Sequence, residues 1–222
     1  MYTPWEIIDN AATVDGEDLI LARTGPRWEV HTGWRMLMSS EQHDSEEALA
    51  ELALRRVPGA KRVLVGGLGL GYTLRATLDL LPSDAEVVVA ETSDALVRWN
   101  RTHLAELAGR PIEDPRVRLV MGSVADRIAE SDGAYDAILL DVDNGPYALV
   151  HEFNNALYDE AGTRASLRAL SPEGVLAVWS AYPNDDYLDL LLDSGLAAEA
   201  IVAPAGGTAG DEHIIFIGTK RS

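Results

Sequence analysis

The stretch from Val63 to Glu91 limits what this chain of 222 residues can fold into more than any other part of it. It reads VLVGGLGLGYTLRATLDLLPSDAEVVVAE. An apolar run enters a turn with alternating glycines, a helical stretch follows, and a second apolar run ends on an acid. This order predicts two parallel strands joined by a helix, with the main chain open to a nucleotide-like ligand at the glycines.

The spacing of the glycines narrows the kind of ligand. Glycines at 67, 69 and 71 form G-x-G-x-G, and Tyr72 stands where the dinucleotide fingerprint G-x-G-x-x-G has its third glycine. The spacing disfavours a nicotinamide enzyme and is typical of S-adenosylmethionine (SAM) sites. We expect the main chain at Gly67, Gly69 and Gly71 to hold this cofactor, because glycine tolerates positive φ and lets a ligand approach closely. Glu91 would accept hydrogen bonds from the ribose hydroxyls; the alternative is an ordinary turn with a solvated Glu91.

Composition and charge limit the kinds of partner that the chain can have. The formal net charge of −18 argues against nucleic acid, because phosphate binding needs a basic surface. The charge is compatible with a cationic substrate such as a polyamine, or simply with solubility. The N-terminus does not resemble a signal peptide, and no apolar run approaches the roughly 18 residues of a membrane span. We therefore expect a cytoplasmic protein without membrane contact.

Metal binding has little support in the sequence. The chain has no cysteine, which excludes disulfides, thiol nucleophiles and thiolate metal sites. His43-Asp44 with Glu46 and Glu47 resembles a metal site but is more simply the charged first turn of a helix. No carboxylate–histidine spacing supports zinc, so we expect no metal.

The rest of the chain alternates between strand and helix signals. The first 40 residues predict a small β appendage, and residues 41–222 predict one α/β domain with a doubly wound parallel sheet, closed by an antiparallel pair. The strands after residue 60 are nearly all apolar, as expected when helices cover both faces of a sheet. The expected strands are Asp18–Thr24, Arg27–Thr32, Arg35–Met38, Arg62–Gly66, Glu86–Glu91, Arg116–Met121, Tyr135–Asp141, Gly174–Ala181, Ala197–Val202 and His213–Thr219. The expected helices are Ser40–Arg56, Gly71–Leu81, Ser93–Leu107, Val124–Ala129, Asn155–Leu170 and Asn184–Ser194.

Polar residues follow the apolar strands at the edge where such a sheet binds its ligand, beyond the carboxyl ends of the strands. Thr92 follows Glu91 directly, and Ser123 and Val124 would flank the adenine. Asp141 ends a buried strand where the transferred group and its acceptor would meet. These residues join the glycines as candidate cofactor-binding residues.

Two acids in the segment ILLDVDNGP are the candidate catalytic residues. Asp141 and Asp143 would hold a protonated amine or accept a proton from an attacking nucleophile. For Asp143, a side-chain turn of the Asx type is an equally good explanation. His151, Glu152 and Tyr158 would line a lid over the site, although each alone is better explained as structural.

The chain resembles spermidine synthase-like proteins over roughly residues 15–185. The β appendage, the helix LMSSEQHDSEEALAELAL, the turn VLVGGLGLGYTLR and the strand end ILLDVDNGP carry the resemblance. These proteins belong to the class I SAM-dependent methyltransferase superfamily. The resemblance implies a Rossmann-like, seven-stranded sheet and a site for SAM or decarboxylated SAM.

Four departures from the family pattern stand at functional positions. Aminopropyltransferases carry G-G-G-D-G-G after the first strand, where their aspartate helps to hold the amine of decarboxylated SAM; Leu70 occupies that position here. Their D-x-x-D motif matches Asp141, but Asn144 replaces the second acid unless Asp143 substitutes for it. The tyrosine and histidine of the preceding helix that approach the amine substrate fall near Ser45 and Glu51. An adenine-side aspartate, common after the third strand, appears as Ser123.

An apolar Leu70 cannot pair with an ammonium group. We therefore expect a SAM-dependent transferase that methylates a small molecule. The first alternative is an aminopropyltransferase that uses decarboxylated SAM and a shifted amine site with Asp143 and Glu46 or Glu47. The second is a non-catalytic nucleoside-binding homologue. The surface around Trp28 and Trp34 is the candidate interface for a homodimer.

Overall fold

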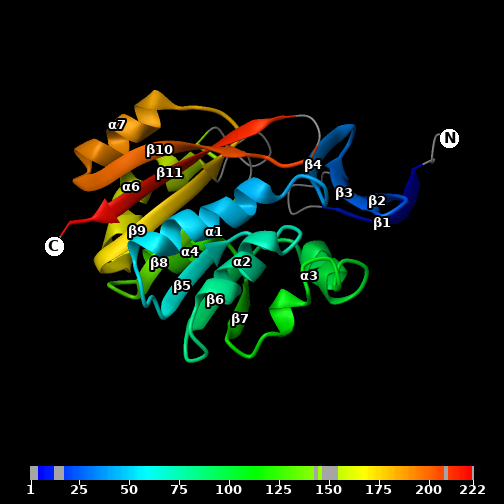
Figure 1. Ribbon diagram of the computed structural model, residues 1–222, viewed down its shortest axis with the longest axis horizontal. Coiled ribbons are helices and arrows are strands. Elements are labelled where there is room, and N and C mark those ends of the chain that lie inside the picture. The colour runs from blue at the N-terminus through cyan, green and yellow to red at the C-terminus, as the bar shows by residue number, and fades with distance from the viewer. Residues whose placement is uncertain (1–4, 13–17, 143–144, 147–154, 208–209, 222) are drawn as a thin grey trace.

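Two β-sheets organise the chain in the computed structural model, which describes residues 5–12, 18–142, 145–146, 155–207 and 210–221. The small sheet is antiparallel, with strand order β1-β2-β3-β4. The large sheet has seven strands in the order β10-β11-β9-β8-β5-β6-β7. The small sheet lies at one end of the molecule (right in Figure 1), beside the large sheet and its helices.

The strands of the large sheet confirm the predicted doubly wound architecture. Strands β7, β6, β5, β8 and β9 pair in parallel, and β11 pairs antiparallel with both β9 and β10. The strands are β1 Glu6–Ala12, β2 Asp18–Thr24, β3 Arg27–Thr32, β4 Arg35–Ser39, β5 Arg62–Gly66, β6 Glu86–Glu91, β7 Val117–Met121, β8 Tyr135–Leu140, β9 Leu170–Ser180, β10 Leu196–Pro204 and β11 Glu212–Lys220. The helices are α1 Asp44–Arg56, α2 Tyr72–Leu80, α3 Asp94–Arg101, α4 Val124–Ala129, α5 Asn155–Tyr158, α6 Glu160–Ala169 and α7 Asp185–Asp193, with a 3-10 turn η1 at Pro111–Glu113.

Helices cover both faces of the large sheet, so each strand sends alternate residues into two cores. Val63 and Val65 of β5 pack with α1 and α2 on one face. Leu64, between them, packs on the other face with residues of α4, α6 and α7. This burial on both sides explains why the strands are almost wholly apolar.

A third apolar cluster joins the small sheet to the large one. Leu19, Leu21 and Val30 of the small sheet pack against Leu70 of the glycine turn, and the cluster also contains Trp99 of α3. All of these side chains are buried. The small sheet is therefore held directly against the turn that the sequence predicts as the cofactor site. The division into an appendage at 1–40 and a domain at 41–222 stays a prediction.

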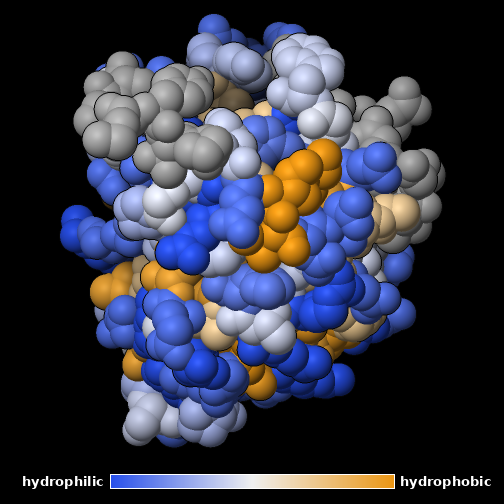
Figure 2. All heavy atoms as spheres, turned by 90° about the vertical axis from the view of Figure 1, so that its right-hand side faces the viewer, coloured by the Kyte–Doolittle hydropathy of each residue, from blue (hydrophilic) through white to orange (hydrophobic). Residues whose placement is uncertain are grey.

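The outer end of the molecule, formed by the small sheet, is mostly hydrophilic. Figure 2 shows hydrophobic side chains gathered there in one strip among hydrophilic ones. Trp34 is 90% exposed at this end. The predicted dimer through this region stays a prediction. Among the described helices, none is long and apolar enough to cross a membrane.

Several predicted boundaries were wrong for local reasons. The first helix begins at Asp44 rather than Ser40, because Ser39 and Gln42 form a bridge before it. The helix after β6 ends at Arg101, beyond which Thr102 turns the backbone out of the helical conformation. The helix expected at Asn155–Leu170 is two helices, because Asp159 caps α6 by accepting a hydrogen bond from Gly162 N at 2.8 Å.

The structure also contains one strand that the sequence did not predict. Strand β1 is the edge of the small sheet and pairs with β2 through an irregular register between Ile7 and Asp9. Its residues are mostly exposed, so its sequence lacks the alternation of a half-buried strand.

Candidate cofactor and acceptor site

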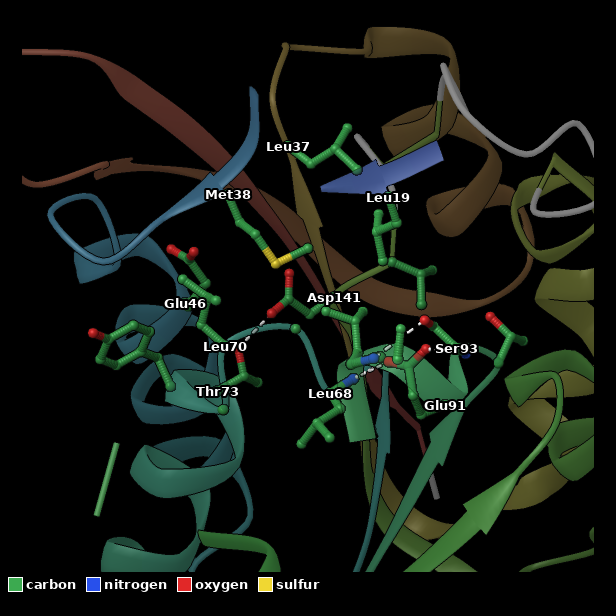
Figure 3. A pocket seen from close by; sticks show the side chains of 18 of the residues that line it. Leu19, Leu37, Met38, Glu46, Leu68, Leu70, Thr73, Glu91, Ser93 and Asp141 are labelled. Carbon is green, nitrogen blue, oxygen red and sulfur yellow. Dashed lines mark hydrogen bonds between the residues drawn. The ribbon is translucent and has the colours of Figure 1, made fainter. Parts of the chain in front are cut away.

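A cavity of about 810 Å³ opens at the carboxyl ends of β5, β6 and β8, against the small sheet. Its position agrees with the expectation for a doubly wound sheet. Figure 3 shows the side chains that line it, with Leu19, Leu37 and Met38 of the small sheet facing residues of the large sheet. The described residues predicted as cofactor-binding or catalytic all line this cavity: Gly67, Gly69, Gly71, Glu91, Thr92, Ser123, Val124 and Asp141.

The glycine turn between β5 and α2 needs glycine at its first position. Gly67 has a φ of 85°, and a Cβ atom there would lie 2.3 Å from the main-chain oxygen of Asp141. The main chain at Gly67 donates to Ala90 O at 3.0 Å. Asn100 of α3 fixes the middle of the turn by donating from Nδ2 to Gly69 O at 2.9 Å. The turn is therefore a tight backbone cradle that faces the cavity and is held by its neighbours on both sides.

Glu91, at the end of β6, is buried and supports this turn. One carboxylate oxygen accepts from Leu68 N at 2.9 Å, and the other accepts from Ser93 N at 2.7 Å. Burial raises the pKa of Glu91, while hydrogen bonds from the main chain act in the opposite direction. The main chain at Thr92 and Gly69 also acts on this carboxylate. Because Glu91 lines the cavity, a ligand hydroxyl there would share its oxygens with these main-chain donors.

The residues predicted near the adenine lie at the start of α4. Ser123 caps this helix, with its side chain accepting from Ala125 N at 3.1 Å. Val124 is buried against Gly66, where an added Cβ atom would lie 2.9 Å from Cγ2 of Val124. Ser123 therefore has a structural task in capping, besides lining the cavity.

Asp141 follows β8 and lines the cavity, as do the acids Glu46, Glu91 and Asp94. Its Oδ2 accepts from Thr73 Oγ1 at 2.5 Å. Burial raises the pKa of Asp141 to about 6, against the opposing effect of the bond from Thr73. The second predicted catalytic acid, Asp143, lies outside the described residues, as do Asn144, His151 and Glu152.

Tyr158, the remaining predicted lid residue, is buried and not part of the cavity wall. Its hydroxyl donates to Val142 O at 3.3 Å, and its ring meets that of Tyr187 edge-on at 5.8 Å between centroids. These contacts support the structural explanation for this residue.

Glu46 is a further acid of the cavity; its sequence context predicts a charged helical turn or, in the aminopropyltransferase alternative, part of a shifted amine site. The first turn of α1 is indeed acidic, with Asp44, Glu46 and Glu47. Glu46 nevertheless lines the cavity, and its pKa is raised to about 8 by burial and then by the negative charge of Asp141. Its spacing was a usable signal, since Glu46 lies three and four positions before the buried Leu49 and Ala50 and so shares their helix face.

The acids have few counter-charges around them. Among the described residues that line the cavity, the one arginine, Arg98, pairs with Asp9 at 2.8 Å, and no lysine lines it. The partly buried acids Glu46 and Asp141 repel each other when both are charged, and a cation placed between them relieves that repulsion. The acidic wall is therefore suited to a positively charged group.

Comparison with known proteins agrees with this arrangement. The model of the spermine/spermidine synthase domain family matches residues 42–185. The chain belongs to this family. The resemblance stated from the sequence motifs is thus confirmed, and the two acids and the glycine turn lie within the matched region of the family.

Relatives within the family differ in the reaction that their names give. The chain is 34% identical over 134 residues to polyamine aminopropyltransferase 2 of Caldanaerobacter subterraneus subsp. tengcongensis, covering 58% of this chain and 44% of that protein. It is also 34% identical over 131 residues to putrescine N-methyltransferase 1 of Nicotiana tabacum, covering 59% of this chain and 33% of the relative. The alignments thus span less than half of the length of these relatives.

Solved structures share the fold of the family over nearly the whole chain. A spermidine synthase in complex with the transition-state analogue AdoDATO aligns with a TM-score of 0.78 at 16% identity, covering 96% of this chain and 72% of that one. A probable spermidine synthase from Corynebacterium glutamicum ATCC 13032 aligns with a TM-score of 0.69 at 15% identity, covering 96% and 80%. The predicted class I methyltransferase-type sheet with an N-terminal β-structure is thereby confirmed.

Proposed function

We propose that this chain is a SAM-dependent transferase that methylates a small amine in the cavity between its two sheets. The observation that carries the proposal is the occurrence of two partly buried acids, Glu46 and Asp141, in the same cavity as an apolar Leu70. The acids provide the wall for a cationic acceptor. Leu70 stands in place of the aspartate with which the family's aminopropyltransferases hold the amine of decarboxylated SAM.

The residues around the glycine turn fit a nucleoside cofactor. The main chain from Gly67 to Gly71 offers a surface without side chains at the glycines, and Glu91 lines the cavity beside it, where its carboxylate would accept from ribose hydroxyls. Thr92 would extend this ribose side. Ser123 and Val124 would lie beside the adenine. SAM, when bound, supplies a methyl group on a positively charged sulfur.

The protein's own part in the reaction is alignment, exclusion of water and control of one proton. Holding an amine nitrogen in line with the carbon that it attacks replaces a bimolecular step by an effectively unimolecular one. Asp141 is the group that would orient the amine or accept its proton, because its carboxyl faces the cavity and Thr73 fixes one of its oxygens. Leu19, Leu37 and Met38 would cover the reacting atoms from the side of the small sheet.

Binding and turnover together test this proposal. Calorimetric titration with SAM, decarboxylated SAM and methylthioadenosine compares the ligands, and chromatography of reactions with putrescine identifies the product. We expect SAM to bind more tightly than decarboxylated SAM and methylated putrescine to form. Asp141→Asn should lower kcat about a hundredfold or more, the usual effect of losing a general base. Asp126→Asn, at an exposed position on α4, is the matched control. Equal turnover of the two variants would remove Asp141 from its role.

Aminopropyl transfer is the second candidate, and a specific observation favours it. Glu46 offers an acid in the same cavity, which could hold an amine from a different wall than the family's aspartate. The polyamine aminopropyltransferase among the relatives is as similar to this chain as the methyltransferase. Preference for decarboxylated SAM, with spermidine as the product from putrescine, would reverse our order.

A further inference from the structure

A buried serine connects Glu46 with a histidine of the last strand. Ser45 Oγ lies 2.7 Å from Glu46 Oε2 and 2.9 Å from Nδ1 of His213 on β11. Trp179 of β9 donates from Nε1 to the same hydroxyl oxygen at 3.0 Å. Ser45 has no exposed surface, whereas Glu46, Trp179 and His213 all line the cavity.

The three contacts of Ser45 determine how protons are distributed. A serine hydroxyl offers one hydrogen and two acceptor positions. The tryptophan N–H is a donor only and takes one acceptor position of the oxygen. Of the two remaining partners, one must accept the hydroxyl hydrogen and the other must donate to the oxygen. One proton is therefore shared between Glu46 and Nδ1 of His213 as long as the three contacts persist.

Two arrangements satisfy this requirement. In the first, the protonated carboxyl of Glu46 donates to Ser45, and Ser45 donates to His213. In the second, His213 donates from Nδ1 to Ser45, and Ser45 donates to the carboxylate of Glu46. They interconvert when one proton moves from Glu46 to Ser45 while another moves from Ser45 to His213.

The environment of both ends favours the first arrangement in the free protein. Burial and the charge of Asp141 raise the pKa of Glu46 to about 8, so that it holds its proton at neutral pH. Burial lowers the pKa of His213, against the opposite effect of Asp211. Tyr72 is unsuited to exchange this proton, because burial and the neighbouring Glu46 and Glu47 raise its pKa to about 12.

We propose that Glu46, Ser45 and His213 form a proton relay. The relay removes the proton from the Glu46 carboxyl and later returns it, while an amine binds and reacts beside Asp141. This proposal rests on the proposed function, because the amine is the acceptor inferred above. Glu46 would be a catalytic residue that touches the amine, whereas Ser45 and His213 would be positioning residues that act through it.

The proton steps balance as follows. Glu46 first passes its proton through Ser45 to Nδ1 of His213, and the partly exposed imidazolium releases the proton from Nε2 to water. An N–H bond of the bound ammonium then breaks, and its proton forms an O–H bond on the Asp141 carboxylate, while the Glu46 carboxylate pairs with the positive charge of the amine. The freed electron pair on nitrogen forms the new N–C bond as the C–S bond breaks and its electrons stay on sulfur. After the methylated ammonium leaves, Asp141 gives its proton to water. His213 then takes a proton from water on Nε2 and passes that of Nδ1 through Ser45 to Glu46, which restores the starting state.

The relay predicts a coupled titration in the free protein, which NMR of labelled histidine side chains measures without any substrate. The charged or titratable groups around the pair are Asp44, Glu47, Tyr72, Asp141 and Asp211. We expect Nδ1 of His213 to be an unprotonated acceptor at pH 7 and to change its signal as Glu46 titrates near pH 8. Ser45→Ala and Glu46→Gln should abolish that change. Glu51→Gln, an exposed acid of the same helix, should preserve it. A titration of His213 that is identical in wild type and Ser45→Ala would overturn the relay.

Turnover with SAM and putrescine supplies the second readout. We expect His213→Gln to lower kcat about tenfold or more, to change KM for putrescine less than about threefold, and to shift the pH profile of kcat. Added imidazole should restore part of the activity of His213→Ala. An unchanged pH profile in His213→Gln would contradict the relay. If wild type neither binds nor methylates putrescine, the proposed function fails, while the histidine titration still decides whether the relay exists.

Discussion

The substitution Leu70→Asp restores the acid of the family's aminopropyltransferases, and we expect it to destabilise this protein. Leu70 is 5% exposed and packs with Leu19, Leu96 and Trp99 in the cluster that joins the two sheets. Loss of the leucine forfeits about 1.5–3 kcal/mol of burial free energy. A buried carboxyl without a partner adds about 1–3 kcal/mol. Together these effects predict a loss of about 2.5–6 kcal/mol in the free energy of unfolding.

The effect should depend on pH in a defined direction. In the apolar cluster the introduced carboxyl has a folded-state pKa above its unfolded value of about 4. The folded state then holds the proton more tightly than the unfolded state, so stability is highest below pH 4 and falls as the pH rises toward the folded pKa. Leu70→Asn is the matched control, because it has nearly the same shape and polarity without a titrating charge.

Urea unfolding at pH 5 and pH 8 measures both effects. We expect similar losses for the two variants at pH 5 and a larger loss for Leu70→Asp at pH 8. Addition of decarboxylated SAM should recover part of the difference, because its ammonium can pair with the new acid. A Leu70→Asp variant as stable as wild type at pH 8 would refute the reasoning, since it would mean that this position is solvated from the cavity.

Two further predictions concern the same site. Gly67→Ala should cost about 3 kcal/mol or more and abolish SAM binding by calorimetry, because its Cβ atom would lie 2.3 Å from a main-chain oxygen. Gly59→Ala, at a φ of 81° but with no atom within 4 Å of the added Cβ, should cost only the conformational term of about 1–2 kcal/mol; equal losses would contradict the steric argument. The free energy of unfolding should fall between about pH 4 and pH 8, because burial raises the folded-state pKa values of Asp141 and Glu46, and the protein gives up these protons only above them. In urea unfolding, Glu46→Gln should make the free energy of unfolding less dependent on pH between pH 6 and pH 8. The same pH dependence as wild type in this range would contradict the assignment of Glu46.

The sequence predicted those parts of the fold that depend on local patterns. Apolar runs such as that of β5 and the glycine turn were sufficient for the large sheet, because residues buried on both faces leave a continuous signal. Strand β1 was not predicted, because an exposed edge strand imposes little hydrophobic pattern on its residues. The break between α5 and α6 at Asp159 was not predicted, because the helix signal continues on both sides of this one capping residue.

In the candidate site, too, the residues marked by local patterns were predicted and the long-range contacts were not. Glu91 and Asp141 were found because they end apolar strands at the ligand-binding edge, a position that sequence order reveals. The partners of Glu46 are different, since Ser45 and His213 lie 168 positions apart and meet only in the folded chain. Trp179, which orients the same serine, is 134 positions away from it. No local pattern records such a contact. The sequence therefore named Glu46 only as one option, with Glu47, for a shifted amine site, and its link to His213 through Ser45 was recognised only in the folded chain.

The packing of Leu70 against the small sheet has a consequence for how relatives of this chain can diverge. A residue of the glycine turn that rests on Leu19, Leu21 and Val30 cannot change its chemistry alone. We expect the turn position and these strand positions to vary together, with apolar residues at all of them in one lineage and polar ones around the acid in another. The evolution of donor choice in this family would then be recorded in the small sheet as well as in the motif that binds the donor.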